Sequence, residues 1–213
     1  GDSGLQNFFW LAVFFGILAA HHRDRFMTAV VACFLCLLSP AVACHLIVGG
    51  DYVANALYVL AFSALLLQAA GRRAPAWQGP LWAALLGLGL SSRPNFVLIL
   101  PLVLFQLARA SSARRAGGLL AITLIVFGAV TLPFYFHDPA GFSPLHTAGK
   151  LSPGRAFDWA PLAVTTLGAA LAFALAAWRK KPDLPGLMRD IFAVQAFVIV
   201  GGFVLACLAA EGL

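Results

Sequence analysis

The stretch from His45 to Arg93, HLIVGGDYVANALYVLAFSALLLQAAGRRAPAWQGPLWAALLGLGLSSR, decides the fold. It contains, in order, an acidic Gly-Gly-Asp corner, an apolar helix, a basic Gly-Arg-Arg turn, a short Gly-rich helix and an isolated arginine. Pro94 follows, and proline disfavours the helical state of the preceding residue and cannot donate a backbone hydrogen bond. The two short apolar segments on either side of Arg93 therefore form either a helical hairpin or one broken helix.

The composition indicates an integral membrane protein. Of the 213 residues, 62% are hydrophobic and only 10% are charged, and the mean hydropathy is +0.91. A soluble domain carries about 25% charged residues. The apolar runs are long enough to cross a hydrocarbon core of roughly 30 Å as helices, and they lack the alternation of barrel strands. The sequence predicts an all-α, polytopic transmembrane helical bundle.

We expect about eight spans, including the short pair around Arg93. The predicted spans are Leu5–Ala20, Phe26–Val48, Tyr52–Ala70, Pro80–Ser92, Phe96–Ala108, Gly118–Phe136, Pro161–Trp178 and Ile191–Ala210. They form one predicted transmembrane domain, residues 1–213. Because the chain begins at Gly1, with Asp2 ahead of the first apolar run and no basic segment, we expect a fragment or a processed product of a longer protein.

The distribution of basic residues distinguishes the hairpin from the broken helix. With a hairpin, one side of the membrane receives eleven Arg and Lys residues and the other only three, which are Arg93, Lys150 and Arg155. A broken helix would place basic loops on opposite sides. The positive-inside rule assigns the crowded side to the cytoplasm. This topology accounts for the formal charge of +6 without a nucleic-acid partner, and it predicts no site in the cytoplasmic loops.

The opposite, extracytoplasmic face receives the acidic corner at Asp51 and the longest loop, at about residues 137–160. Asp51 lies between His45 and Tyr52, at a membrane rim where a lipid-linked substrate would present its head group. A carboxylate there could act as a base or a metal ligand. Alternatively, Asp51 is an N-cap of the third span, and the two roles can coexist.

Arg93 is a candidate phosphate ligand. An arginine between two short apolar helices is costly unless it reaches water, a carboxylate or a phosphate, and its guanidinium suits bidentate phosphate binding. Alternatively, the short helices let its side chain reach the membrane interface and pair with lipid head groups.

The long loop offers a second set of candidates. His137 and Asp138 follow the sixth span and could act in acid/base chemistry or bind a metal, and Lys150 or Arg155 could receive an anionic group. Alternatively, Asp138-Pro139 is a turn and the remainder is a solvated loop. No defined cofactor or metal site is predicted, although these carboxylates could bind a divalent cation. Glycines in the apolar runs predict close helix packing, at Gly87, Gly89, Gly201 and Gly202.

Several of these segments resemble the membrane core of the GT-C superfamily of integral-membrane glycosyltransferases. The resemblance rests on IVGGD at residues 47–51, ALYVLAF at 56–62, GLGLSSRP at 87–94, LILPL at 98–102, and the PF and DPxGF pattern at 133–142. The closest likeness is to bacterial mannosyltransferase-like proteins.

The resemblance implies transfer of a sugar from a polyprenyl-phosphate donor to an envelope glycan or glycolipid, on the extracytoplasmic face of the bacterial inner membrane. Arg93 matches the family's basic position and Asp51 its acidic corner. The family's first-loop acidic motif has no counterpart except Asp2, which makes Asp2 a third acidic candidate.

A different class of function is a non-catalytic membrane scaffold subunit, or a transporter for a lipid or small solute. A transporter would favour polar residues at mid-membrane and matched broken helices in two halves. The short pair occurs once, and Gln68, Gln106 and Gln195 lie near the predicted span ends. The sequence therefore favours transport less than the other two functions.

Overall fold

The computed structural model describes residues 12–13, 16, 51–71, 74–92, 94–138, 160–179, 181 and 183–210. All regular structure in these ranges is helical, which confirms the predicted all-α class for this part of the chain. The first two predicted spans lie outside the described residues, apart from residues 12–13 and 16.

Six α-helices and one 3₁₀ helix, η2, make up the described part. They are α4 (Asp51–Gly71), α5 (Gln78–Ser92), η2 (Pro94–Ile99), α6 (Leu100–Ala110), α7 (Ala113–His137), α9 (Ala160–Trp178) and α10 (Leu184–Ala210). Each α-helix overlaps a predicted span, and η2 and α6 together cover the single span predicted at Phe96–Ala108. However, α7 and α10 begin several residues earlier than predicted, because Ser112 and Asp183 cap them: the Ser112 Oγ accepts from Arg115 N–H at 3.2 Å, and Asp183 Oδ2 from Gly186 N–H at 3.0 Å.

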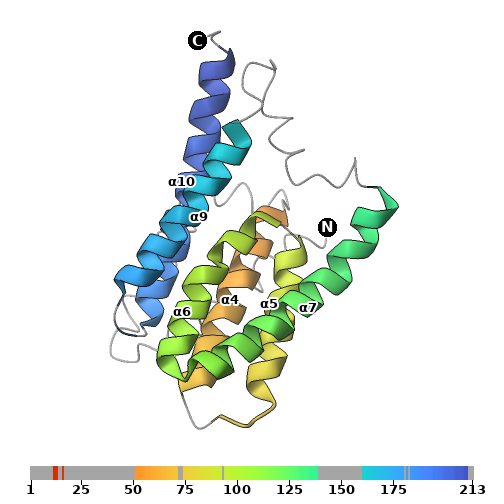
Figure 1. Cartoon of the computed structure of the whole chain (residues 1–213), viewed down its shortest axis with the longest axis vertical. Helices are drawn as coiled ribbons and strands as arrows, with labels where there is room; N and C mark the ends of the chain where they lie inside the picture. Colours follow the sequence, from red (N-terminus) through yellow and green to blue (C-terminus); the bar gives the residue numbers. More distant parts are fainter. Residues whose placement is uncertain are drawn as a thin grey trace.

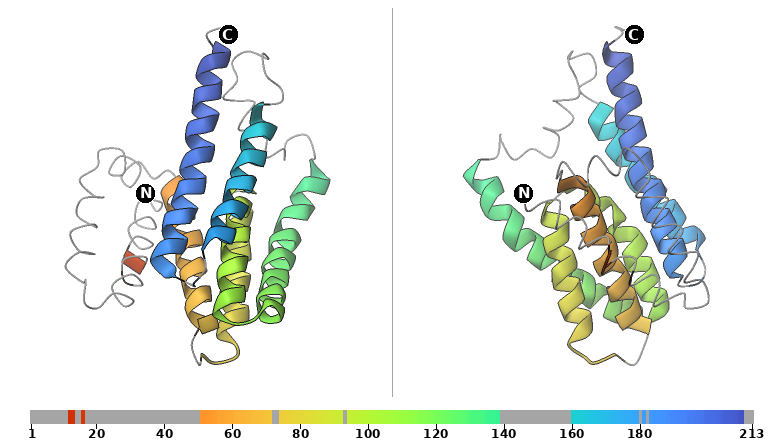
Figure 2. Two further views of the ribbon diagram at one scale, coloured as in Figure 1. Left: turned by 60° about the vertical axis from the view of Figure 1, so that its left-hand side comes forward. Right: turned by 180° about the vertical axis from the view of Figure 1, so that it is seen from behind.

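The short segments around Arg93 form two separate helices that run in opposite directions (Figures 1 and 2). The helix α5 ends at Ser92, η2 begins at Pro94, and α6 then returns toward the end of the bundle where α5 began. The α4–α5, α6–α7 and α9–α10 connections consequently lie at one end, which we call the basic end. The beginnings of α4 and α9 and the ends of α5, α7 and α10 lie toward the opposite end (Figure 1).

The helix α5 packs between α4 and α7, and its glycines permit the close approach. A Cβ on Gly87 would lie 2.5 Å from the backbone oxygen of Thr123 in α7, and one on Gly89 would lie 2.6 Å from the Tyr58 ring in α4. The buried Thr123 hydroxyl donates to the Ala83 carbonyl at 3.0 Å. The predicted role of Gly87 and Gly89 is thus confirmed, whereas a Cβ on Gly202 would meet open space.

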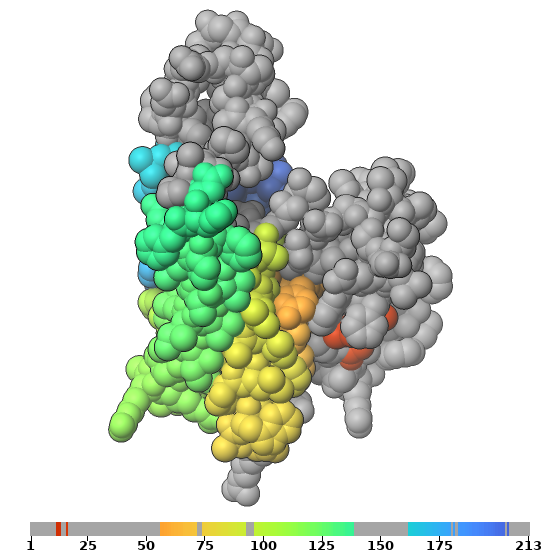
Figure 3. Space-filling view, turned by 90° about the vertical axis from the view of Figure 1, so that its right-hand side faces the viewer, coloured from red at the N-terminus to blue at the C-terminus, as the bar shows by residue number. Residues whose placement is uncertain are grey.

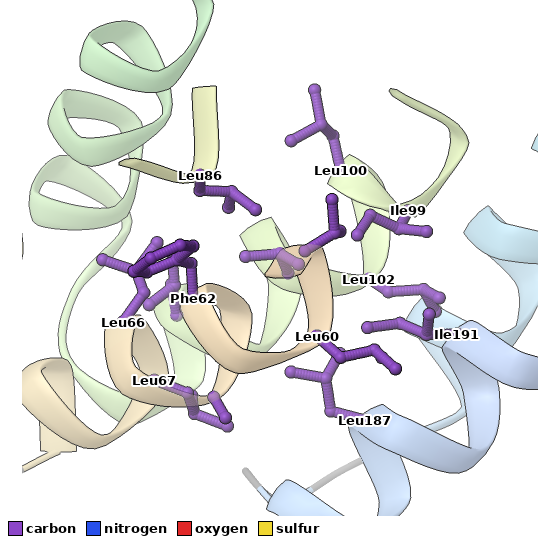
Figure 4. Packing of buried hydrophobic residues seen from close by; sticks show 14 of the residues in the cluster. Leu60, Phe62, Leu66, Leu67, Leu86, Ile99, Leu100, Leu102, Leu187 and Ile191 are labelled. Carbon is purple, nitrogen blue, oxygen red and sulfur yellow. The ribbon is translucent and has the colours of Figure 1, made fainter. Parts of the chain in front are cut away.

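A single hydrophobic cluster connects the helices. Figure 4 shows Leu60 of α4 and Leu102 of α6 facing Leu187 and Ile191 of α10, and all four are buried. The α9–α10 pair is therefore held against α4 and α6 by contacts near the basic end, while both helices extend beyond α4 at the opposite end (Figure 2).

Large apolar side chains remain exposed outside this cluster. They include Leu124, Ile125, Leu132, Phe134 and Phe136 of α7, Leu162, Leu167 and Phe173 of α9, and Phe192, Phe197, Ile199 and Val200 of α10. Exposed apolar surface of this extent marks contact with a membrane or with another protein.

Two helices are long and apolar enough to cross a membrane, over Ala113–His137 and Leu184–Gly202. Only 17% of the most apolar window of α7 is buried, against 44% for α10. The apolar segments in α4, in η2 with α6, and in α9 are shorter. Length and apolarity thus identify two candidate spans in the described residues, whereas the predicted bundle has about eight.

We expect Gly87→Ala to lower the free energy of unfolding by about 1–3 kcal/mol, because the new methyl group would overlap the α7 backbone at Thr123. Chemical denaturation in mixed micelles measures the change. Gly128→Ala is the matched control in α7, since its Cβ would lie 3.6 Å from its nearest neighbour, Leu132. Equal stability of the two variants would contradict the close α5–α7 approach.

Candidate functional site

The predicted site residues fall mostly outside the described part. Asp51 and Tyr52 begin α4, but only their backbone is described. His137 ends α7, and Asp138 caps it, its N–H donating to the Phe134 carbonyl at 3.1 Å. Both of these side chains are exposed. The other candidates, Asp2, His45, Arg93, Lys150 and Arg155, lie outside the described residues.

The backbone brings two of the predicted regions together. Gly89 of α5 contacts Tyr58 of α4, and the two helices are antiparallel, since Phe62 stacks on Trp82 at 5.9 Å between ring centroids. Residues later in α5 therefore face residues earlier in α4. Ser92, the chain neighbour of Arg93, ends α5 close to the first turns of α4, which Asp51 begins.

Asp138 lies at the same end of the bundle but apart from this pair. The helix α7 leans away from α4 toward its C-terminus in all three ribbon views (Figures 1 and 2). Within the described residues, no group of three His, Cys, Asp or Glu side chains could hold a metal ion. At this end of the bundle, the described residues therefore include two acidic residues, Asp51 and Asp138, that lie apart from each other.

The described part of the chain does contain a charged cluster, at the basic end. Arg179, just after α9, donates through Nε to Asp190 Oδ2 and through Nη2 to Asp190 Oδ1, the latter at 2.8 Å. The Arg179 side chain is 16% exposed and that of Asp190 only 5%. This bidentate ion pair connects the end of α9 to the second turn of α10.

Asp183 and Gly186 complete the junction. Asp183 Oδ2 lies 3.8 Å from Arg179 Nη1 and also caps α10. A Cβ on Gly186 would lie 2.5 Å from the guanidinium carbon of Arg179. Glycine at this position therefore makes room for the guanidinium group against the first turn of α10.

Two residues of α6 attach this junction to the rest of the bundle. The buried Gln106 accepts from the Asp183 backbone N–H through Oε1 at 3.3 Å. Arg109 donates through Nη1 to the Ala176 carbonyl in the last turn of α9 at 2.7 Å, and its guanidinium carbon lies 5.4 Å from the centre of the Phe105 ring. The three helices are thus held together by polar contacts at this end.

The chemistry of this cluster is that of a fixed ion pair. Hydrogen bonding to the Asp190 carboxylate raises the pKa of Arg179 above its ordinary value, against an opposing effect of burial. Arg179 therefore remains a cation and cannot serve as a base. The pair neutralises both charges and leaves the carboxylate committed to two donors, which suits a structural role.

The sequence predicts no site at this end and does not identify this cluster. A signal was present, because Asp183 and Asp190 lie among basic residues, seven positions apart. Such spacing puts two side chains on one face of a helix after two turns. The identity of their partner depended on the direction in which α9 returns to α10.

No family model, curated protein or solved structure matches the chain.

Removal of one member of the Arg179–Asp190 pair should lower the free energy of unfolding by about 3–5 kcal/mol, because the other charge would be left buried. We expect Asp190→Ala to show this loss in chemical denaturation. The double variant Arg179→Met/Asp190→Leu, which removes both charges, should recover most of it. A double variant no more stable than Asp190→Ala would contradict the ion-pair interpretation.

Proposed function

We propose that the chain is part or all of a polytopic membrane glycosyltransferase of the GT-C type, acting at the end of the bundle opposite the basic end. The placement of α5 against α4 is the observation that supports the proposal, because Gly89, one turn before Arg93, packs on Tyr58, two turns after Asp51, in an antiparallel pair of helices. A carboxylate and an arginine at one membrane rim suit a hydroxyl acceptor and a phosphate-bearing donor.

The separation of charges supports the membrane orientation in this proposal. Every described Arg and Lys residue belongs to the basic end, in or next to the α6–α7 and α9–α10 connections: Arg109, Arg114, Arg115, Arg179, Lys181 and Arg189. The exposed Trp77 and Trp178 lie at the same end. Tryptophans are typical of either membrane interface, and an excess of Lys and Arg is typical of the cytoplasmic one, so the Asp51 end would face outward from the bacterial inner membrane.

The reaction transfers the anomeric carbon of the donor sugar from a polyprenyl phosphate to an acceptor hydroxyl. Asp51 accepts the hydroxyl proton as the oxygen attacks the anomeric carbon. The bond from this carbon to the phosphate oxygen breaks, and the polyprenyl phosphate leaves with the electron pair. Arg93 stabilises the negative charge on that phosphate, with Lys150 or Arg155 as further candidates. The acceptor is an envelope glycan or a glycolipid.

Asp138 is the second candidate base, with His137 beside it. It is the weaker candidate, because α7 leans away from the α4–α5 contact toward its C-terminus (Figures 1 and 2). Asp2, His45 and Tyr52 remain proposed contributors around Asp51.

One observation favours transport, the alternative to the glycosyltransferase function. The sequence predicted Gln195 near the end of a span. In the structure it is the twelfth residue of α10 and lies away from the helix ends. Among the described residues, its buried Nε2 has no hydrogen-bond partner. A polar group away from the helix ends is expected in a transporter or in a scaffold that receives another chain.

The proposal predicts that Asp51→Asn lowers sugar transfer about 100-fold or more, the usual contribution of a general base. Transfer of radiolabelled sugar from a polyprenyl-phosphate donor is measured in membranes, together with the amount of folded protein. Arg93→Ala should also lose transfer. Arg189→Ala is the matched control, because this arginine is 77% exposed at the opposite end and should retain the parent rate.

Parent-like transfer by both Asp51→Asn and Asp138→Asn would contradict an acidic base at this end. A parent protein without transfer would favour the scaffold or transporter. In that event, solute uptake into proteoliposomes, compared between the parent and Gln195→Leu, separates the two.

A further inference from the structure

The basic end carries more positive charge than its own acidic residues neutralise. Six described Arg and Lys residues lie at this end, against two described carboxylates, Asp183 and Asp190. Both carboxylates are engaged by Arg179. Arg114 and Arg115, at the start of α7, are exposed, and no described carboxylate lies within ion-pairing distance of either.

Arg115 lies where the beginnings of α5 and α7 meet. Its Nη2 is 4.0 Å from the place that a Cβ on Gly79 would occupy, and the Leu119 side chain is the nearest neighbour of that place at 3.3 Å. Trp77 immediately precedes α5 and is 60% exposed. A cationic group and an exposed indole thus flank the same junction.

An exposed apolar surface continues from this junction along both helices. Leu81 and Leu88 of α5 are exposed and lie seven residues apart, on the same side of the helix. Leu124 and Ile125 are exposed on α7. Figure 3 shows α5 and α7 side by side along this face of the molecule. Charge at one end and apolar surface beside it match an amphiphile better than a soluble anion.

We propose that the beginnings of α5 and α7 bind the head group of an anionic phospholipid, through Arg114 and Arg115, with Trp77 at the interface and an acyl chain along α5 and α7. The inference rests on the membrane placement in the proposed function but not on sugar transfer. Arginines suit the phosphate because they present several donors to its oxygens. Attraction to an anionic membrane surface adds to this contact.

Two double variants with equal loss of charge at the same end test the site. Arg114→Gln/Arg115→Gln removes the proposed ligands. Lys181→Gln/Arg189→Gln removes two exposed charges, one from the α9–α10 connection and one from the second turn of α10, where Arg189 Nε lies 3.8 Å from Asp190 Oδ1. Both lie away from the α5–α7 junction. Native mass spectrometry measures the apparent dissociation constants of phosphatidylglycerol and phosphatidylcholine for the full chain in micelles.

Each basic residue near an anionic surface changes lipid affinity by about fivefold. We therefore expect Arg114→Gln/Arg115→Gln to weaken phosphatidylglycerol binding about 25-fold and to leave phosphatidylcholine binding unchanged. The control should change phosphatidylglycerol binding less than threefold. Arg114→Lys/Arg115→Lys should retain part of the preference, since charge remains but the planar guanidinium does not.

Equal weakening in the two glutamine variants would overturn the site in favour of diffuse attraction, and so would a parent protein with no preference for phosphatidylglycerol. Displacement of the lipid by inorganic phosphate at equal concentration would also overturn it. Carbonate extraction from phosphatidylcholine vesicles checks membrane placement separately. A parent protein released by carbonate removes the membrane premise, whereas a retained protein without lipid preference contradicts this inference alone.

Discussion

The close packing of α5 between α4 and α7 is the constraint on which the rest of the structure depends. Gly87 and Gly89 face different neighbours, and each allows an approach that a side chain would prevent. In a bilayer, lipid tails are as apolar as the helix surfaces, so helices associate through close contact and hydrogen bonds. The Thr123 hydroxyl adds such a bond across the α5–α7 contact.

This packing also determines which chain segments meet at each end. Because α5 is antiparallel to α4, its last turns lie beside the first half of α4, as the contact between Gly89 and Tyr58 shows. Because α7 lies beside α5 in the same direction, the Arg114–Arg115 pair comes to the start of α5, as the proximity of Arg115 to Gly79 shows. The proposed catalytic end and the proposed lipid contact are thus two consequences of one arrangement of helices.

The Arg179–Asp190 pair has a different role from the other charges. It is buried, bidentate and reinforced by Asp183, whereas Arg114, Arg115 and Arg189 are exposed. Such a pair contributes little net stability compared with apolar residues of similar size, but removal of only one of its two charged partners is strongly destabilising. It defines how α9 turns into α10, and Gln106 and Arg109 attach that turn to α6.

The sequence by itself determined the helical class and the approximate extent of the described helices, except the starts of α7 and α10, because apolar runs and the Gly, Pro and charged residues between them act locally. It also identified Arg93 and Pro94 as a reversal. Only the tertiary structure decided the partners. Arg109 meets Ala176, and Gln106 meets Asp183, across 67 and 77 residues. Those contacts depend on the directions in which the helices run and, at the α9–α10 junction, on the space that Gly186 leaves for Arg179, which no local pattern encodes.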